Sequence, residues 1–166
     1  MNIFLCGSND LTALDGQEIY NYLSRYAPKH NIHLLCYKSI ENEVLRFFVE
    51  NEELASHLHV YTLQPLHELS HVFRDIMEYL DAQGNNYSSF NYSSTKIYRS
   101  RYIDFLKQIF QNIDLVLCFY NGNNHTAVIP VDVAKECKID ALIYDLPGDN
   151  KDLARQSLKN KMRVIE

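Results

Sequence analysis

The sequence predicts an α/β fold, a Rossmann-like three-layer sandwich around a mainly parallel sheet of about five strands. Short apolar runs alternate with longer segments of helical periodicity. The strongest run is apolar nearly throughout, which is typical of a strand covered on both faces. Strands joined through helices imply right-handed crossovers and therefore parallel neighbours. A chain of 166 residues suits one such domain, and we expect a single domain over 1–166.

Five short apolar runs are the expected strands. They cover residues 2–6, 32–37, 58–63, 113–120 and 139–144. The run at 113–120, Ile-Asp-Leu-Val-Leu-Cys-Phe-Tyr, is the strongest of them. A final helix from Asp149 and a short edge strand at 162–165 complete the expected order.

Helices are expected where apolar residues recur at helical spacing between these runs. They cover residues 14–26, 39–51, 66–80 and 98–109, with another after 120. Pro28 closes the first helix, and the Ser39 hydroxyl is suited to cap the second. Pro130 fits the first position of the helix after 120, which would place Asp132 in its first turn.

The segment around 84–96 interrupts this alternation and is expected to be a flexible inserted loop. It is polar and rich in small residues apart from Tyr87, Phe90 and Tyr92. These aromatic side chains either pack the loop onto the body of the domain or stack on the base of a ligand when the loop closes over it.

The composition excludes several classes of protein. A net charge of -5 and a pI of about 5.8 argue against coating nucleic acid, whose phosphates attract basic surfaces. Apolar runs stay well below the ~20 residues of a membrane span, and the first residues lack the features of a signal peptide. The four cysteines, without any C-x-x-C, suit free thiols in a reducing compartment. We therefore expect a cytoplasmic protein.

The strand ends nominate a candidate binding site. In open parallel sheets, ligands bind beyond the carboxyl ends of the strands. The polar residues that follow the first, second and fourth strands are Gly7, Ser8, Asn9, Lys38, Ser39, Asn121, Gly122, Asn123, Asn124, His125 and Thr126. Gly7 and the loop at 122–126 would offer backbone N–H groups to a phosphate, and Lys38 would neutralise its charge. Each of these segments, taken alone, is more typical of a structural turn, and the site is predicted from their convergence on one edge of the sheet.

Two segments carry a resemblance to a known family. Ile-Phe-Leu-Cys-Gly-Ser-Asn-Asp at 3–10 resembles an opening strand and its Gly-Ser turn. Asp-Leu-Val-Leu-Cys-Phe-Tyr-Asn-Gly at 114–122 resembles an aspartate, a lipophilic strand and a glycine. Both segments are similar to the SLOG superfamily of Rossmann-like proteins, which includes the lonely-guy phosphoribohydrolases and the DNA-processing protein A domain. Ala134 falls near that superfamily's helix alanine, and Arg99 or Arg101 resembles the arginine that opens its preceding helix.

The resemblance implies binding of a nucleotide or nucleotide-derived ligand, with Arg101 joining Lys38 as a second cation. The chain departs from the pattern at several positions. His125 replaces the usual glycine before Thr126, and Ile129 stands where the lonely-guy enzymes have a glutamate. Residues 37–39 replace a glycine-rich turn. We therefore expect a binding protein, such as a sensor or a sequestering protein, without a cofactor.

An enzyme on the same fold is the alternative, as a nucleoside or nucleotide N-glycosyl hydrolase or transferase. That chemistry needs a carboxylate at the anomeric carbon. The carboxylates nearest the expected cleft are Asp10, Asp15, Glu41 and Glu43. Glu41 or Glu43 could serve only if turned inward, since at a helix start such residues usually compensate the helix dipole. No catalytic residue is assigned. Homodimerisation through Phe- and Tyr-rich helix faces is also compatible with the composition.

One motif points to different chemistry. His67-Glu68-Leu69-Ser70-His71 matches the H-E-x-x-H pattern of zinc proteases. On one continuous helix, the two histidines would lie opposite the apolar stripe and face solvent. A suitable third ligand is also lacking downstream, so we disfavour a zinc protease and expect no metal site.

Overall fold

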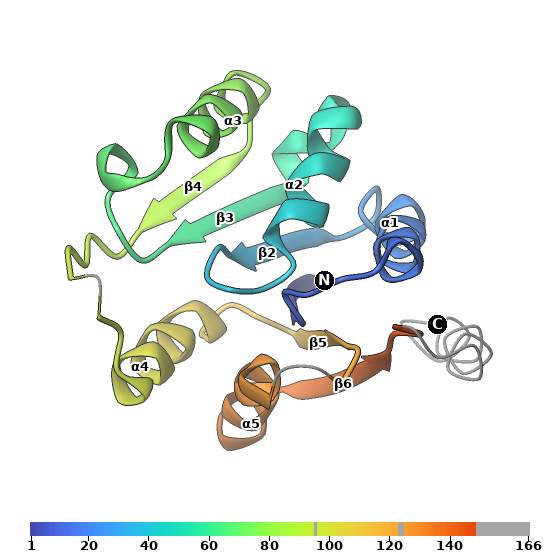
Figure 1. The fold of residues 1–166 in the computed structure, drawn as a ribbon, viewed down its shortest axis with the longest axis vertical. Coiled ribbons are helices and arrows are strands. Elements are labelled where there is room, and N and C mark those ends of the chain that lie inside the picture. Colours follow the sequence, from blue (N-terminus) through green and yellow to red (C-terminus); the bar gives the residue numbers. More distant parts are fainter. Residues whose placement is uncertain (95, 123–124, 149–166) are drawn as a thin grey trace.

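The computed structural model describes residues 1–94, 96–122 and 125–148. Its centre is a six-stranded sheet in which every pair of neighbours is parallel, in the order β4-β3-β2-β1-β5-β6 (Figure 1). The strands are β1 (Asn2–Gly7), β2 (Asn31–Leu35), β3 (Leu58–Thr62), β4 (Asn86–Ser89), β5 (Leu115–Tyr120) and β6 (Asp140–Asp145). The predicted α/β class is confirmed, with six strands where about five were expected. The expected helix from Asp149 and strand at 162–165 lie outside the described residues.

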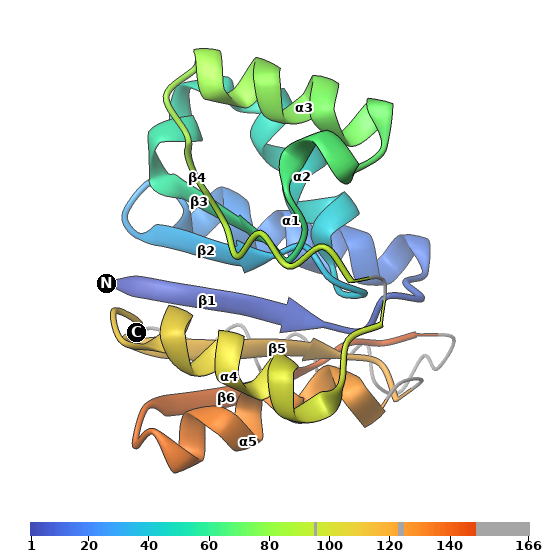
Figure 2. The same cartoon turned by 90° about the vertical axis from the view of Figure 1, so that its left-hand side faces the viewer.

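Helices cover the sheet on both faces. They are α1 (Ala13–Tyr26), α2 (Glu41–Glu50), α3 (His71–Ala82), α4 (Arg99–Phe110) and α5 (Ile129–Glu136), with 3-10 turns at Glu52–His57, Leu66–Glu68 and His125–Val128. Helices α1, α2 and α3 share one core with the sheet, and α4 and α5 share the other (Figure 2). This arrangement is the three-layer sandwich that the sequence predicts. Among the described residues, no helix combines the length and the hydropathy that crossing a membrane requires.

The pleat of β1 divides its side chains between the two cores. Ile3 and Leu5 pack under α1, whereas Phe4 and Cys6 face α4 and α5. The ring of Phe4 meets that of Phe110 edge-on, with 5.0 Å between centroids. Nearly all of β1 is buried because it lies in the middle of the sheet and is covered on both sides.

The expectation of a loop throughout 84–96 is wrong at Asn86–Ser89, which form β4. This strand pairs with β3 at the edge of the sheet. Its sequence, Asn-Tyr-Ser-Ser, carries no apolar run because all four side chains stay partly or fully exposed. Phe90 then packs 4.4 Å from the ring of Phe105, and Tyr87 hydrogen-bonds Thr62 at 2.6 Å. These aromatic side chains therefore hold the segment onto the domain.

Two expected helix starts also differ. Ile40, which offers no side-chain cap, precedes α2, and the Ser39 hydroxyl contacts Gly7 instead. Helix α3 begins at His71 after Ser70, whose Oγ accepts the Phe73 N–H at 3.2 Å. His67 lies in the preceding 3-10 turn, so the two histidines of the H-E-x-x-H motif do not share one helix.

A chain of hydrogen bonds crosses β2, β3 and β4 on the sheet face that α4 and α5 cover elsewhere. His33 Nε2 lies 3.0 Å from Asn2 Oδ1, and His33 Nδ1 lies 2.9 Å from the Tyr61 hydroxyl. That hydroxyl lies 3.2 Å from His59 Nδ1, and His59 Nε2 lies 2.8 Å from Ser88 Oγ. Two neutral imidazoles satisfy all four bonds, each as donor through one nitrogen and acceptor through the other.

This network favours uncharged histidines. Burial, and then the charge of His59, lower the pKa of His33 to about 4, against an opposing effect of Asp114. Burial also lowers the pKa of His59. A protonated imidazole can only donate, so protonation breaks the chain of bonds at that residue.

We predict that acid destabilises the fold through His33. Its pKa is about 4 in the folded state and ~6.5 in the unfolded state, so stability is complete above ~6.5 and is lost as the pH falls towards 4. The loss is about 3 kcal/mol, since each unit of pKa difference is worth about 1.4 kcal/mol. Urea unfolding of the wild type and of His33→Gln between pH 7 and 4 measures it, with exposed His67→Gln as the control. An equally steep pH dependence in His33→Gln would contradict the prediction.

Candidate functional site

A cavity of about 270 Å³ lies at the carboxyl ends of the central strands. Strand β1 pairs with β2 on one side and with β5 on the other, so the chain reverses its direction of winding there. Open sheets bind ligands at such a switch point. We call this cavity the switch-point cleft. Its lining residues are Cys6, Gly7, Tyr37, Lys38, Ser39, Ile97, Arg99, Tyr102, Thr126, Ala127, Ile129 and Pro130.

Gly7 ends β1 where its backbone meets that of β5. A Cβ atom at this position would lie 2.2 Å from the Phe119 carbonyl oxygen, so only glycine fits. The Gly7 N–H donates to Ser39 Oγ at 2.9 Å, and the Ser39 hydroxyl donates to the Gly7 carbonyl at 3.3 Å. Ser39 thus fixes the loop between β2 and α2 to the end of β1.

Aromatic rings and two cations also line the cleft. The rings of Tyr37 and Tyr102 lie 5.5 Å apart, and the Lys38 ammonium lies 5.5 Å from the Tyr37 ring centroid. Lys38 has a φ of 47°, a left-handed conformation that is uncommon outside glycine and is enriched at functional sites. Arg99, the first residue of α4, adds a second exposed cation.

The arginine that lines the cleft is Arg99, whereas the sequence predicted Arg101. Arg101 stacks over the rings of Tyr92 and Phe105, at 5.6 and 5.3 Å from their centroids, and does not line the cleft. Arg99, two residues earlier on the helix, does line it. The prediction of Arg101 as a cleft residue is therefore corrected to Arg99.

The other predicted residues fall into three groups. Gly7, Lys38, Ser39 and Thr126 line the cleft, and their contact with a ligand stays a prediction. Ser8, Asn9, Asn121 and Gly122 do not line it, although Gly122 has the positive φ of 90° expected of a glycine turn. Asn123 and Asn124 lie outside the described residues, and His125 begins a 3-10 turn.

Ser8 and Asn121 join the ends of β1 and β5. Ser8 is fully buried, and its N–H donates to the Phe119 carbonyl at 2.9 Å. Its Oγ accepts the Asn121 N–H at 3.1 Å. The Asn121 side-chain amide donates to the Asp10 carbonyl at 2.6 Å and to Asp15 at 3.1 Å. These two residues therefore have a structural role in the turns.

Asp15, one of the carboxylates considered for catalysis, is fully buried at the start of α1. It accepts the Thr12 N–H at 3.1 Å in a capping box and the Gly148 N–H at 2.7 Å. With the bond from Asn121, its carboxylate connects three segments of the chain. These bonds leave it without access to a substrate in the cleft.

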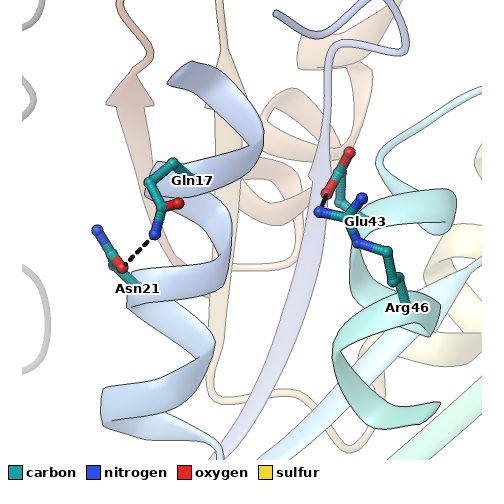
Figure 3. A network of polar contacts seen from close by, with 4 residues as sticks. All are labelled: Gln17, Asn21, Glu43 and Arg46. Carbon is teal, nitrogen blue, oxygen red and sulfur yellow. Dashed lines mark hydrogen bonds and ion pairs between the residues drawn. The ribbon is translucent and has the colours of Figure 1, made fainter. Parts of the chain in front are cut away.

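Glu41 and Glu43 point in different directions from α2. The Glu41 carboxylate is half-buried and accepts the Ser39 N–H at 2.7 Å. Burial raises the pKa of Glu41, against the opposing effect of hydrogen bonds from the backbone of residues 38, 39 and 41. Glu43 instead lies against Gly16 of α1 and pairs with Arg46 at 3.2 Å. Figure 3 shows this pair on α2 and the separate Gln17–Asn21 hydrogen bond on α1. Glu41 alone meets the requirement of an inward-turned carboxylate, although it lines a neighbouring groove rather than the cleft.

One thiol and one phenol bring neutral polar groups to the cleft. Cys6 lines it and pairs in register with Cys118 of β5. Burial, followed by the neighbouring Cys118, raises the pKa of Cys6, so its thiol stays protonated and is a poor nucleophile. Burial also raises the pKa of Tyr102, with smaller contributions that include the charge of Glu41. The Tyr102 hydroxyl is therefore available as a neutral hydrogen-bonding group.

Cys6, Tyr37, Ile97 and Tyr102 were not predicted as site residues. The strand-end rule points to polar residues after strands. These four are mostly apolar or aromatic, and they reach the cleft from the end of β1, from the residues after β2 and from the start of α4. Sequence position could have indicated two of them, since Cys6 directly precedes Gly7 and Tyr37 directly precedes Lys38.

Comparison with known proteins leaves the family open. Neither a protein-family model nor a curated protein sequence matches this chain. Within residues 1–94, 96–122 and 125–148, no group of three or more histidine, cysteine, aspartate or glutamate side chains could hold a metal ion. The SLOG resemblance accordingly stays a prediction from the sequence.

We predict that Gly7→Ala destabilises the fold by more than about 2 kcal/mol, because the new methyl group would overlap the Phe119 carbonyl. Gly122→Ala is the matched control. Its Cβ would meet nothing within 4 Å, so it carries only the strain of a positive φ, about 1 kcal/mol. Chemical unfolding compares the two, and equal losses would contradict the close approach at Gly7.

Proposed function

We propose that this protein binds a nucleotide or nucleotide-derived ligand in the switch-point cleft, with its phosphate near Lys38 and Arg99. The observation that carries the proposal is the meeting of these two cations at the carboxyl ends of β1, β2 and β5. They come from segments about 60 residues apart in a chain whose net charge is -5. A concentration of positive charge in an acidic protein favours a single small anion over a nucleic-acid strand.

The remaining lining suits the rest of such a ligand. Tyr37 and Tyr102 offer ring surface against which a base can pack, and the Thr126 hydroxyl lies on the α5 side of the cleft. A volume of about 270 Å³ is close to the lower limit for small-molecule pockets, roughly 300 Å³. The cleft therefore favours a mononucleotide-sized ligand over a dinucleotide.

Binding without turnover, as in a sensor or sequestering protein, is the form we favour. The described residues that line the cleft include no carboxylate, which N-glycosidic cleavage needs beside the sugar. Ile129 occupies a place in the cleft wall and cannot exchange a proton. Reversible binding of the ligand needs no catalytic group, and the cations, hydroxyls and aromatic rings of the cleft are sufficient for it.

A nucleoside or nucleotide N-glycosyl hydrolase or transferase is the second candidate, and Glu41 is the observation that favours it. Its carboxylate is one hydrogen bond from Ser39 of the cleft, and burial raises its pKa towards the range of a general acid. This candidate requires the start of α2 to move so that the carboxylate turns from the neighbouring groove to the cleft.

We predict that AMP, cyclic AMP or ADP-ribose raises the melting temperature of the wild type, and that Lys38→Ala and Arg99→Ala each weaken the affinity for the stabilising ligand about tenfold. Each variant removes a charge-assisted contact, which is worth about 1.5 kcal/mol. Arg101→Ala and Lys135→Ala are the matched controls, because both residues are exposed cations outside the cleft. Calorimetric titration measures the affinities. Equal losses in the Arg99 and Arg101 variants, or no ligand effect at all, would contradict the proposed site.

The same ligands distinguish binding from turnover. After prolonged incubation, chromatography is expected to recover the ligand intact. Free base released by the wild type, and absent with Glu41→Gln, would instead establish the enzymatic alternative.

A further inference from the structure

A second cavity, of about 460 Å³, lies between α2 and α3 on the other side of the segment 37–39 from the switch-point cleft. We call it the α2–α3 groove. Its walls are mainly apolar and comprise Leu45, Val49, Leu69, Val72, Phe73 and Ile76. Val72 is 68% exposed and Val49 is 36% exposed, so part of this apolar surface faces solvent. The volume and the apolar lining are those of a site for a small organic molecule.

Three polar side chains form the inner end of the groove, and only one of them carries a charge. The Thr62 hydroxyl is engaged with the Gln64 carbonyl at 2.9 Å and with Tyr87 at 2.6 Å. Burial, followed by the charge of Glu41, raises the pKa of Cys36, so this thiol is neutral. Glu41 therefore determines the electrostatic preference of the inner end.

Glu41 has no cationic partner among the described residues. Its carboxylate is held by backbone N–H groups, with Ser39 at 2.7 Å. Arg46, the one cation that lines the groove, pairs with Glu43 at 3.2 Å (Figure 3). A half-buried carboxylate whose pKa is raised by burial gains stability when a cation arrives beside it.

We propose that the α2–α3 groove binds a small amphipathic organic cation, whose apolar body packs between α2 and α3 and whose ammonium or amidinium group contacts Glu41. The apolar body accounts for the walls, and charge complementarity with Glu41 fixes its orientation. An amphipathic anion would instead place its negative charge beside the Glu41 carboxylate. A neutral molecule would leave the charge of Glu41 uncompensated. This site is separate from the switch-point cleft and does not depend on its function.

Three probes of similar shape separate charge from hydrophobicity. Tryptamine, tryptophol and indole-3-propionate share an indole ring and end in an ammonium, a hydroxyl and a carboxylate. In NMR titrations of the full chain, we expect tryptamine to bind at least tenfold more tightly than either of the others, with saturable shifts at Val49, Val72 and Ile76. Equal affinities for the three probes, no saturable binding of tryptamine, or shifts confined to the switch-point cleft would each overturn the proposal.

Glu41→Gln tests the charge directly. This variant is expected to bind tryptamine about tenfold more weakly while its affinity for tryptophol stays unchanged. Glu50→Gln, which removes an exposed carboxylate of the same helix outside the groove, is expected to behave as the wild type. An unchanged tryptamine affinity in Glu41→Gln would overturn the assignment.

A measurement on the wild type covers the case in which Glu41→Gln fails to fold. Carboxyl-detected NMR follows the titration of Glu41 with and without tryptamine. Bound tryptamine is expected to lower the pKa of Glu41, and tryptamine affinity is expected to fall on acidification while that of tryptophol does not. A Glu41 titration that tryptamine leaves unchanged would overturn the proposal.

Discussion

The close approach of β1 and β5 at Gly7 and Phe119 is the constraint on which the rest of the structure depends. A side chain at position 7 would collide with the Phe119 carbonyl, which receives the Ser8 N–H instead. The strand order reverses between these two strands, and the cleft opens at their carboxyl ends. The Gly7 backbone also anchors Ser39, which positions the loop between β2 and α2. One backbone contact thus determines both the floor of the cleft and one of its walls.

That loop lies between two cavities that are lined by different charges: the cleft by two cations, and the α2–α3 groove by one carboxylate and by Arg46, which pairs with Glu43. Lys38 faces the cleft, where Arg99 adds a second cation, whereas Glu41 faces the α2–α3 groove. The Glu41 carboxylate nevertheless accepts the N–H of Ser39, so the two cavities share one hydrogen-bonded segment. A net charge of -5 conceals this local division, because an electrostatic preference depends on which charges share a cavity.

Strand β4, which the sequence patterns missed, lies in a part of the sheet that no described helix covers on one face. On that face β2, β3 and β4 carry His33, His59, Tyr61 and Ser88, whose hydrogen bonds to one another take the place of an apolar contact with a helix. A strand at such an edge needs no continuous apolar run, and Asn86–Ser89 has none. The predicted strands at 2–6 and 113–120 lie where helices cover both faces, and there burial on both sides requires an apolar sequence.

The sequence by itself determined the α/β class, most elements of the alternation and four residues of the cleft: Gly7, Lys38, Ser39 and Thr126. Apolar periodicity and the strand-end rule are local signals that survive without coordinates. Only the tertiary structure decided that Arg99 rather than Arg101 lines the cleft, that Ser8 and Asn121 stabilise turns, and that Glu41 turns inward while Glu43 does not. Those outcomes depend on the angle at which each helix packs and on which partner each polar group finds. Such contacts join residues far apart in the chain, and no local pattern encodes them.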